Sequence, residues 1–377
     1  MIKSHDSFYM QRALDLAKRG IYTTTPNPNV GCVIVKDEQI IGEGYHYKAG
    51  QPHAEVYALN MAGDNAKGAT VYVTLEPCSH YGRTPPCANA LIEAQVKRVV
   101  IAMLDPNPMV SGYGVQRLKE AGIDVDVGLL TEQAEQINRG FLKRMRTGKP
   151  FIILKMAASL DGKTAMASGE SKWITSSEAR QDVQTLRAKC SAILSTSATV
   201  LADDPRLTVR WSAFPEKIKQ HYPITDIRQP IRIILDSQHR LTLKEQLFKQ
   251  QGQIWLIRKV AFKGEKLPDN VKIVVDPTPE PLINLDWLFT TLAQAQINSI
   301  WVEAGAQFAG ALIQQNLVDE LIIYLAPKLL GHQARSLCKL PHLNQLSDCP
   351  TFQFVDVTTI GPDLRLRLKT TPPDVSL

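Results

Sequence analysis

The residues with the clearest chemistry are one histidine, one glutamate and two cysteines in three short segments. His53 and Glu55 share the motif His-Ala-Glu, Cys78 ends Glu-Pro-Cys, and Cys87 follows Pro-Pro. An imidazole and two thiolates suit zinc, and three protein ligands leave a fourth position for water. Zinc can lower the pKa of that water to about 7. We expect His53, Cys78 and Cys87 to bind zinc, and Glu55 to shuttle protons as the catalytic group.

Alternating strands and helices are predicted around these residues. The expected strands cover 30–35, 40–45, 69–75, 99–103 and 123–127, and the expected helices cover 10–17, 53–62, 88–94, 115–121 and 130–141. This alternation is typical of a three-layer α/β/α domain. Ligands gather at the carboxyl ends of strands in such sheets, where the turn Asp105-Pro106-Asn107-Pro108 follows a strand.

Length and composition indicate a two-domain globular protein. The 377 residues exceed what one core usually supports, and 44% are hydrophobic and 21% charged. The sequence contains no run of 18 apolar residues, so it predicts no membrane-spanning helix. The first residues lack the apolar core of a signal peptide. Six cysteines are too few for a disulfide scaffold, so we expect Cys32, Cys190, Cys338 and Cys349 to be reduced, most often packed in the core, and the protein to be cytoplasmic.

The positive charge lies entirely in the second half. Basic and acidic side chains are equal in number through residue 145, so the remainder carries the whole net charge of +6. No dense run of Lys and Arg occurs, which argues against a nucleic-acid partner. A mild excess of positive charge suits phosphorylated small molecules, although a solvated surface explains it equally well.

A basic segment at 143–150 marks the expected domain boundary. We place the first domain at 1–145, the second at 146–369 and a disordered tail at 370–377. The second domain is predicted to contain a helix starting near Ser176, another at 287–295, and strands at 151–157, 192–195, 231–235, 254–257, 271–275, 299–302 and 320–325. The small-residue turn at 304–310 opens a helix, and either a phosphate cradle or close strand–helix packing accounts for it.

Four motifs of the first half are informative when taken together: Pro26-Asn27-Pro28-x-Val30-Gly31, His53-Ala54-Glu55, the run from Glu76-Pro77-Cys78 to Pro85-Pro86-Cys87, and Asp105-Pro106-Asn107-Pro108. With these motifs the first half closely resembles the bifunctional pyrimidine deaminase-reductases of riboflavin biosynthesis. The resemblance implies a cytidine-deaminase-like domain. It also implies contacts to the pyrimidine or its ribose phosphate from Asn27, His46, His80, Asp105 and Asn107. From the sequence alone these are polar loop residues, and Asn27 could equally stabilise a turn.

The second half resembles the reductase of the same family. The shared motifs run from Lys155 to Lys163, from Gly169 to Thr175 and from Asp203 to Arg210. The resemblance implies a dihydrofolate-reductase-like α/β fold that uses NADPH. The implied dinucleotide contacts are Ala157, Trp173, Thr199, Asp203, Ser237 and the loop from Gly305, and the implied substrate and phosphate contacts are Ser171, Arg187, Leu207, Arg210 and Glu303. Lys155 and Glu303 are candidates for polar assistance, or for a purely structural ion pair.

Two consecutive reactions are implied by this resemblance. Zinc-dependent hydrolysis would remove an amine from the phosphoribosylated diaminopyrimidinone, and NADPH would then reduce the ribosyl group of the resulting uracil to ribityl. We expect no nucleic-acid or membrane partner, and a homo-oligomer with a dimer favoured. The competing hypotheses are a tRNA or nucleoside deaminase with an unrelated second domain, and a structural zinc beside a binding module.

Overall fold

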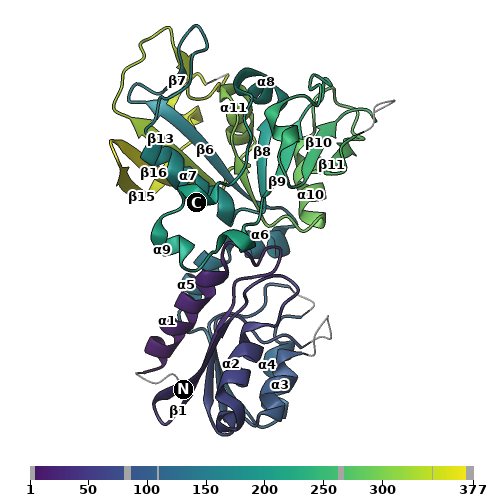
Figure 1. Cartoon of the computed structure of the whole chain (residues 1–377), viewed down its shortest axis with the longest axis vertical. Helices are drawn as coiled ribbons and strands as arrows, with labels where there is room; N and C mark the ends of the chain where they lie inside the picture. Colours follow the sequence, from purple (N-terminus) through teal and green to yellow (C-terminus); the bar gives the residue numbers. More distant parts are fainter. Residues whose placement is uncertain (1–4, 80–85, 108–109, 262–266, 342, 371–377) are drawn as a thin grey trace. The chain divides into compact units, whose positions relative to one another are not determined.

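The computed structural model describes residues 5–79, 86–107, 110–261, 267–341 and 343–370. The chain forms two compact units, Met1–Lys149 and Pro150–Leu377 (Figure 1). Within the described ranges no helix is long and apolar enough to cross a membrane. All six cysteines are free thiols; Cys32 and Cys190 are buried, whereas Cys338 and Cys349 are only partly buried, contrary to the expected core packing.

A five-stranded sheet forms the centre of the first unit. Its order is β2-β1-β3-β4-β5, with β1 antiparallel to both β2 and β3 and the last three strands parallel. The strands are β1 Gly31–Lys36, β2 Gln39–Tyr45, β3 Thr70–Val73, β4 Arg98–Ile101 and β5 Asp124–Val127. Helix α1 (Asp6–Ala17) packs with α5 (Thr131–Ile137), while α2 (Ala54–Ala62), α3 (Cys87–Glu93) and α4 (Tyr113–Glu120) lie together on the other face (Figure 1). The predicted three-layer α/β/α architecture is confirmed.

The helix predicted at 130–141 is in fact two helices. Helix α5 ends at Ile137, and α6 (Arg139–Thr147) takes up most of the segment expected to be a linker. Asn138 breaks the helix because its buried side chain bonds the main chain of Asn29: Asn29 N donates to Asn138 Oδ1 at 2.7 Å, and Asn138 Nδ2 donates to Asn29 O at 2.9 Å. Helical periodicity carries no signal for this long-range contact.

A nine-stranded sheet forms the centre of the second unit, in the order β11-β10-β9-β8-β12-β6-β13-β16-β15. It is parallel from β11 to β13 and antiparallel at β16 and β15. The strands are β6 Phe151–Ser159, β8 Ala192–Thr196, β9 Ile231–Leu235, β10 Ile254–Arg258, β11 Val271–Val275, β12 Ser299–Val302, β13 Glu320–Ala326, β15 Phe352–Ile360 and β16 Asp363–Thr370. The predicted helix start is right, because the Ser176 side chain accepts from Ala179 N.

Helices cover this sheet, and a small ribbon lies beside it. The helices are α7 Ser177–Lys189, α8 Ser197–Asp203, α9 Glu216–Lys219, α10 Leu285–Gln294 and α11 Ala306–Gln314, and the ribbon pairs β7 Lys163–Ala165 with β14 Arg335–Ser336. Parallel strands buried between helices explain the continuous apolar runs in the sequence.

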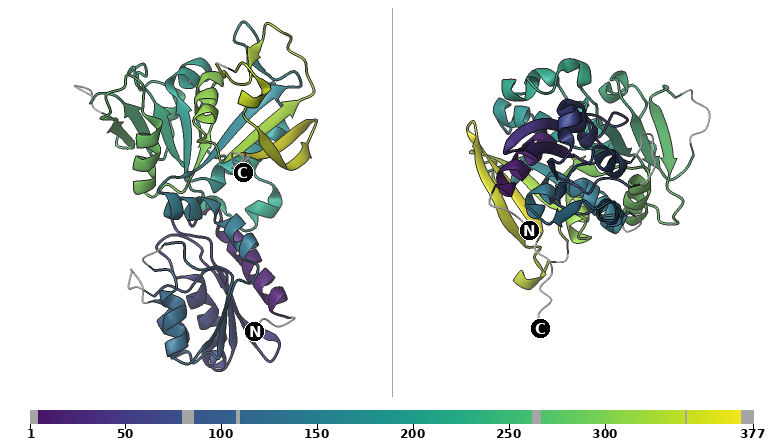
Figure 2. Two further views of the ribbon diagram at one scale, coloured as in Figure 1. Left: turned by 180° about the vertical axis from the view of Figure 1, so that it is seen from behind. Right: turned by 90° about the horizontal axis from the view of Figure 1, so that it is seen from below.

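The hairpin of β15 and β16 was not predicted. It forms one edge of the sheet, with β15 outermost (Figure 2). Polar residues are mixed with apolar ones in both strands, so no uniform apolar run marks them, and β15 is the more exposed of the two. Thr370, expected in the tail, is the last residue of β16, and residues 371–377 of the expected tail lie outside the described residues.

Candidate active sites

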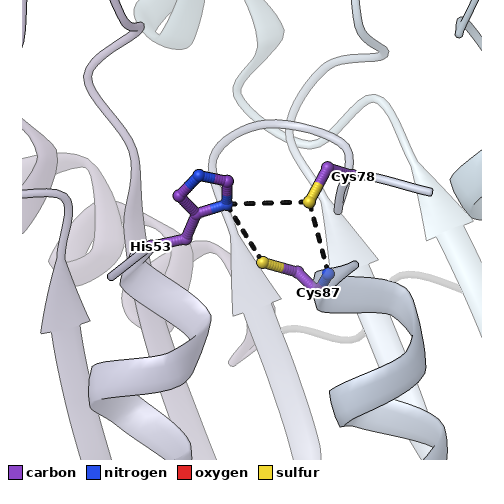
Figure 3. A group of neighbouring side chains, drawn as sticks. All are labelled: His53, Cys78 and Cys87. Carbon is purple, nitrogen blue, oxygen red and sulfur yellow. Dashed lines mark hydrogen bonds between the residues drawn. The ribbon is translucent and has the colours of Figure 1, made fainter. Parts of the chain in front are cut away.

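The three expected metal ligands converge in the first unit. Their ligand atoms all lie within 4.8 Å of one another, and His53 Nδ1 is 3.2 Å from Cys87 Sγ and 3.6 Å from Cys78 Sγ (Figure 3). His53 precedes α2 in an extended conformation, Cys78 follows β3, and Cys87 is the first residue of α3. One nitrogen and two sulfurs at this spacing form the donor set that zinc prefers.

Ionisation of this cluster suits metal binding and proton transfer. Cys87 N donates to Cys78 Sγ at 3.2 Å. Hydrogen bonding from Cys87, and next from His53, lowers the pKa of the Cys78 thiol to about 4. Glu55 is only 3% exposed, and burial raises its pKa to about 7. A carboxyl group with that pKa can both accept and release a proton at neutral pH.

Asn27 and His46 form a hydrogen-bonded pair beside this cluster. Asn27 Nδ2 lies 3.0 Å from His46 Nε2, and His46 Nδ1 lies 3.0 Å from the carbonyl of Pro52. Because a carbonyl can only accept, His46 donates from Nδ1 and accepts from Asn27 at Nε2. The His46 ring stands edge-on to the His53 ring, with centroids 5.5 Å apart. His46 is 3% exposed, and its hydrogen bond orients the Asn27 side chain. The sequence analysis expected His46 itself to contact the substrate.

Two further expected contacts of the first unit, Asp105 and Asn107, lie on one loop. Asp105 and Asn107 follow β4, and Asp105 Oδ1 accepts from Asn107 N at 2.8 Å. Glu76, which the sequence analysis did not single out, accepts from Asp105 N at 3.1 Å. His80 lies outside the described residues.

The expected contacts of the second unit all line one cleft. The cleft has a volume of about 2280 Å³ and includes the carboxyl ends of β8, β9 and β12. All twelve expected residues lie on its walls: Lys155, Ala157, Ser171, Trp173, Arg187, Thr199, Asp203, Leu207, Arg210, Ser237, Glu303 and Gly305. A cleft at the carboxyl ends of parallel strands is where α/β sheets bind dinucleotides.

The Glu303 carboxylate accepts three side-chain hydrogen bonds in the cleft. Arg187 approaches it with two nitrogens, Nε at 2.5 Å and Nη2 at 2.7 Å, and Trp301 Nε1 donates to it at 2.6 Å. Burial opposes ionisation of Glu303, but Arg187 overcomes this effect and lowers the pKa to about 2. The ion pair of Glu303 is therefore with Arg187, whereas a structural alternative with Lys155 was considered from the sequence. Lys155 Nζ lies 6.0 Å from the centroid of the Tyr324 ring.

Three other cleft residues have informative environments. Arg210 forms no side-chain ion pair among the described residues, and its pKa is lowered by burial and then by nearby Arg187. Trp173 is 66% exposed and stacks on the guanidinium of Arg180, 4.2 Å from the ring centroid. Leu207 is only 4% exposed, so a substrate meets its main chain more readily than its side chain.

The turn before α11 combines both alternatives left open by the sequence. Ala304, Gly305 and Ala306 line the cleft, which suits a cofactor contact. A Cβ added to Gly310 would lie 1.8 Å from the carbonyl oxygen of Lys339, so this glycine permits close packing. The start of this turn, at Ala304 to Ala306, therefore lines a cleft with room for a dinucleotide. Gly310, at its end, permits the close packing of α11 against Lys339.

Comparison with known proteins places both units in one family. Residues 150–366 match the model of the RibD C-terminal domain, and residues 3–103 match the cytidine and deoxycytidylate deaminase zinc-binding region. The chain is 60% identical over 363 residues to the riboflavin biosynthesis protein RibD of Escherichia coli K12, covering 96% of this chain and 99% of that protein. The chain belongs to the RibD family.

Other RibD proteins agree along the whole chain. The Haemophilus influenzae protein is 58% identical, over 96% of this chain and 97% of its own. The structure of Acinetobacter baumannii RibD superposes with a TM-score of 0.89 at 48% identity, covering 98% of this chain and 99% of that one. A Thermotoga maritima diaminohydroxyphosphoribosylaminopyrimidine deaminase/5-amino-6-(5-phosphoribosylamino)uracil reductase gives 0.85 at 32%, covering 97% and 99%.

Membership in the RibD family decides between the functional hypotheses. The chain is a bifunctional enzyme of riboflavin biosynthesis, a zinc-dependent deaminase joined to an NADPH-dependent reductase that act on small molecules. The predicted cytidine-deaminase-like and reductase folds are confirmed. The alternatives of an unrelated second domain and of a non-enzymatic protein are wrong.

Sequence reasoning missed two residues that hold the expected site residues in place. Trp301, fully buried, bonds Glu303 from two positions earlier, where alternate residues of a strand face the same side. The two-residue spacing of Trp301 and Glu303 could therefore have predicted this contact from the sequence. Glu76 bonds residues about 30 to 40 positions away, which no local pattern reveals.

Proposed function

We propose that His53, Cys78 and Cys87 hold the zinc of the deaminase and that Glu55 moves the protons of the reaction. The observation that carries this proposal is the convergence of the three ligand atoms within 4.8 Å, beside a buried carboxyl group whose pKa is raised to about 7. When bound, zinc supplies a Lewis acid that lets water ionise near neutral pH.

The chain's own residues then perform the deamination on the diaminopyrimidinone. Glu55 takes a proton from the attacking water and returns it to the departing amine, so that a C–O bond forms, a C–N bond breaks and ammonia leaves. Asn27, oriented by His46, holds the pyrimidine ring. Asp105, Asn107 and His80 are proposed to complete the contacts to the pyrimidine or its ribose phosphate.

In the reductase, we assign the cleft of the second unit to NADPH and the product of the first reaction. Ala157, Trp173, Thr199, Asp203, Ser237 and Gly305 bind the dinucleotide, which supplies a hydride to the sugar when bound. Lys155, Ser171, Arg187, Leu207, Arg210 and Glu303 bind the substrate. Glu303 already engages Arg187, whereas Arg210 forms no side-chain ion pair among the described residues, so we assign the phosphate to Arg210.

One assay tests both halves. Purified protein is supplied with the phosphoribosylated diaminopyrimidinone and NADPH, and ammonia and the absorbance of NADPH are followed together. We expect ammonia to appear first and NADPH to be consumed afterwards, in equal final amounts. When the aminouracil product is supplied instead, NADPH should be consumed without ammonia. Ammonia release without any loss of NADPH would contradict the assignment of the second unit.

We also propose a domain division, a homodimer and a cytoplasmic location. The domain division assigns the deaminase to the first compact unit and the reductase to the second, with the boundary near residue 149. The dimer is supported by the edge strand β15, where Phe354, Val355 and Val357 are 66%, 53% and 55% exposed, because a bare apolar edge strand readily pairs with another chain. Six free thiols suit a reducing compartment.

The dimer can be tested by substitution at this edge. Val357→Lys places a charge on β15 and should shift the mass measured by light scattering from dimer to monomer. Lys369, an exposed residue near the end of the adjacent strand β16, offers a control in Lys369→Ala, which should leave the mass unchanged. A monomeric wild-type protein would contradict the proposal.

A further inference from the structure

A single buried carboxylate organises the loop that carries two of the proposed substrate contacts. Glu76, 5% exposed, accepts four main-chain hydrogen bonds. Its Oε2 accepts from Asp105 N at 3.1 Å and Gly112 N at 3.0 Å, and its Oε1 accepts from Gly114 N at 2.9 Å and Val115 N at 3.1 Å. These bonds use the four lone-pair sites that a carboxylate offers.

The bonds to Oε2 join the two ends of one loop. Within the described residues 105–107 and 110–112, Asp105 Oδ1 accepts from Asn107 N at 2.8 Å, and Asn107 O accepts from Val110 N and Ser111 N, each at 2.9 Å. The loop is thus closed at Asp105 and Gly112 by one atom of Glu76. The main-chain direction at Asp105 and Asn107 depends on this closure.

The same carboxylate belongs to the segment that carries a metal ligand. Glu76 stands two residues before Cys78, and its own N–H donates to Met103 O at 3.0 Å. Gly114 allows the close approach, because a Cβ there would lie 2.2 Å from Pro77 O. Arg117, further along α4, donates to the carbonyl of Ser79 at 3.0 Å. The metal-ligand segment is therefore bonded to the 105–112 loop and to α4 before Cys78, and to α4 again after Cys78.

We propose that Glu76 is a positioning residue of the deaminase, which sets the distance between the metal site and the substrate-binding loop by accepting the amides of Asp105, Gly112, Gly114 and Val115. This inference rests on the proposed roles of Asp105 and Asn107. Only a carboxylate satisfies all four amides, since the Nε2 group of a glutamine would turn donors toward donors. Displacement of the loop would move Asp105 and Asn107 away from the substrate groups that they are proposed to contact, and small misplacements of this kind reduce catalytic efficiency.

The test is Glu76→Gln in the full-length protein, with ammonia release measured against substrate concentration. We expect KM for the diaminopyrimidinone to rise about tenfold, with a smaller change in kcat, because the substrate contacts move while the metal and Glu55 remain. Zinc content and NADPH consumption with the aminouracil should stay at wild-type values. Glu43→Gln is the matched control, because Glu43 is a hydrogen-bonded carboxylate of the same unit that pairs with Arg12.

Three outcomes overturn the inference: an unchanged KM, a loss of activity that follows the loss of zinc, or an equal effect in the Glu43→Gln control. If Glu76→Gln does not fold, hydrogen exchange in the wild-type protein decides. The amides of Gly112 and Gly114 should exchange slowly, and exchange at the rate of an open loop would overturn the inference. A wild-type protein that releases no ammonia would instead refute the proposed function.

Discussion

The two active sites use a buried carboxylate in opposite ways. In the deaminase unit, burial is the largest influence on Glu55 and raises its pKa to about 7. No guanidinium of the described residues contributes to this shift. In the reductase unit, Arg187 outweighs burial and holds the pKa of Glu303 at about 2. A carboxyl group poised near neutrality can exchange protons, whereas a permanently ionised one can bind and orient but not titrate. These environments support our proposals that Glu55 carries protons and that Glu303 binds and orients the substrate.

The strongest way to break this comparison is Glu55→Gln. The amide cannot accept the proton of water, so we expect ammonia release to fall about 1000-fold, within the range typical of general acid–base groups. Zinc content and NADPH consumption with the aminouracil should not change, because His53, Cys78 and Cys87 remain and the reductase is a separate unit. Undiminished ammonia release would show that another group moves the proton.

The next largest effect is expected from Cys87→Ser. Removal of a group that hydrogen-bonds to a metal ligand typically weakens metal binding by up to about 100-fold. Loss of a thiolate ligand itself should weaken zinc binding by more than this. Metal analysis after dialysis and ammonia release should fall together, and zinc added in excess should partly restore the activity. Cys32→Ser changes another buried thiol of the same unit and serves as the comparison. Full turnover without bound metal would contradict the site.

A smaller effect is expected at the phosphate contact of the reductase. Arg210→Ala should raise KM for the aminouracil about tenfold to 100-fold, because hydrogen bonds to charged groups contribute about 1.5–3 kcal/mol. The kcat should change little, since the phosphate is bound equally in substrate and transition state. Lys244→Ala, an exposed cation of the same unit, is the control. An unaltered KM would indicate that another cation of the cleft binds the phosphate.

The smallest effect sharpens the carboxylate comparison through stability. A glutamate whose pKa is lowered in the folded state stabilises that state at pH values above its ordinary pKa near 4.5. This stabilisation is lost as the pH falls toward 2. The lowered pKa of Glu303 therefore contributes to stability at neutral pH. Chemical unfolding of the wild type between pH 6 and 3 should lose stability more steeply than unfolding of Glu303→Gln. Parallel curves would show that the Arg187 pair does not perturb Glu303.

The metal cluster of the first unit was predicted from the chemistry of its own residues, whereas the cleft residues of the second unit were predicted from resemblance. His53 and Cys87 lie at the starts of helices and Cys78 lies in the loop after β3, and their soft-ligand chemistry is readable without knowing the fold. In the reductase, residues from Lys155 to Gly305 meet only because β6, β8, β9 and β12 are neighbours in the sheet. There, resemblance to the family supplied the residues, and periodicity supplied only the strands.

The missed features share one physical origin. Asn138 interrupts a helical pattern to bond Asn29, Glu76 bonds distant amides, and the β15–β16 hairpin has no uniform apolar run. Each depends on a partner far along the chain, and such partners are set by tertiary packing. Local propensity therefore located elements well and misjudged the points where distant segments bond.

The paired amides of Asn29 and Asn138 also limit how the enzyme can be divided. The region shared with cytidine deaminases ends at residue 103, yet the loop bearing Asn27 is tied to a residue 35 positions further on. A fragment trimmed to the shared region would keep every metal ligand and lose the anchor of its substrate-facing turn. Expression of a stand-alone deaminase must therefore retain the chain through α6, which ends at Thr147.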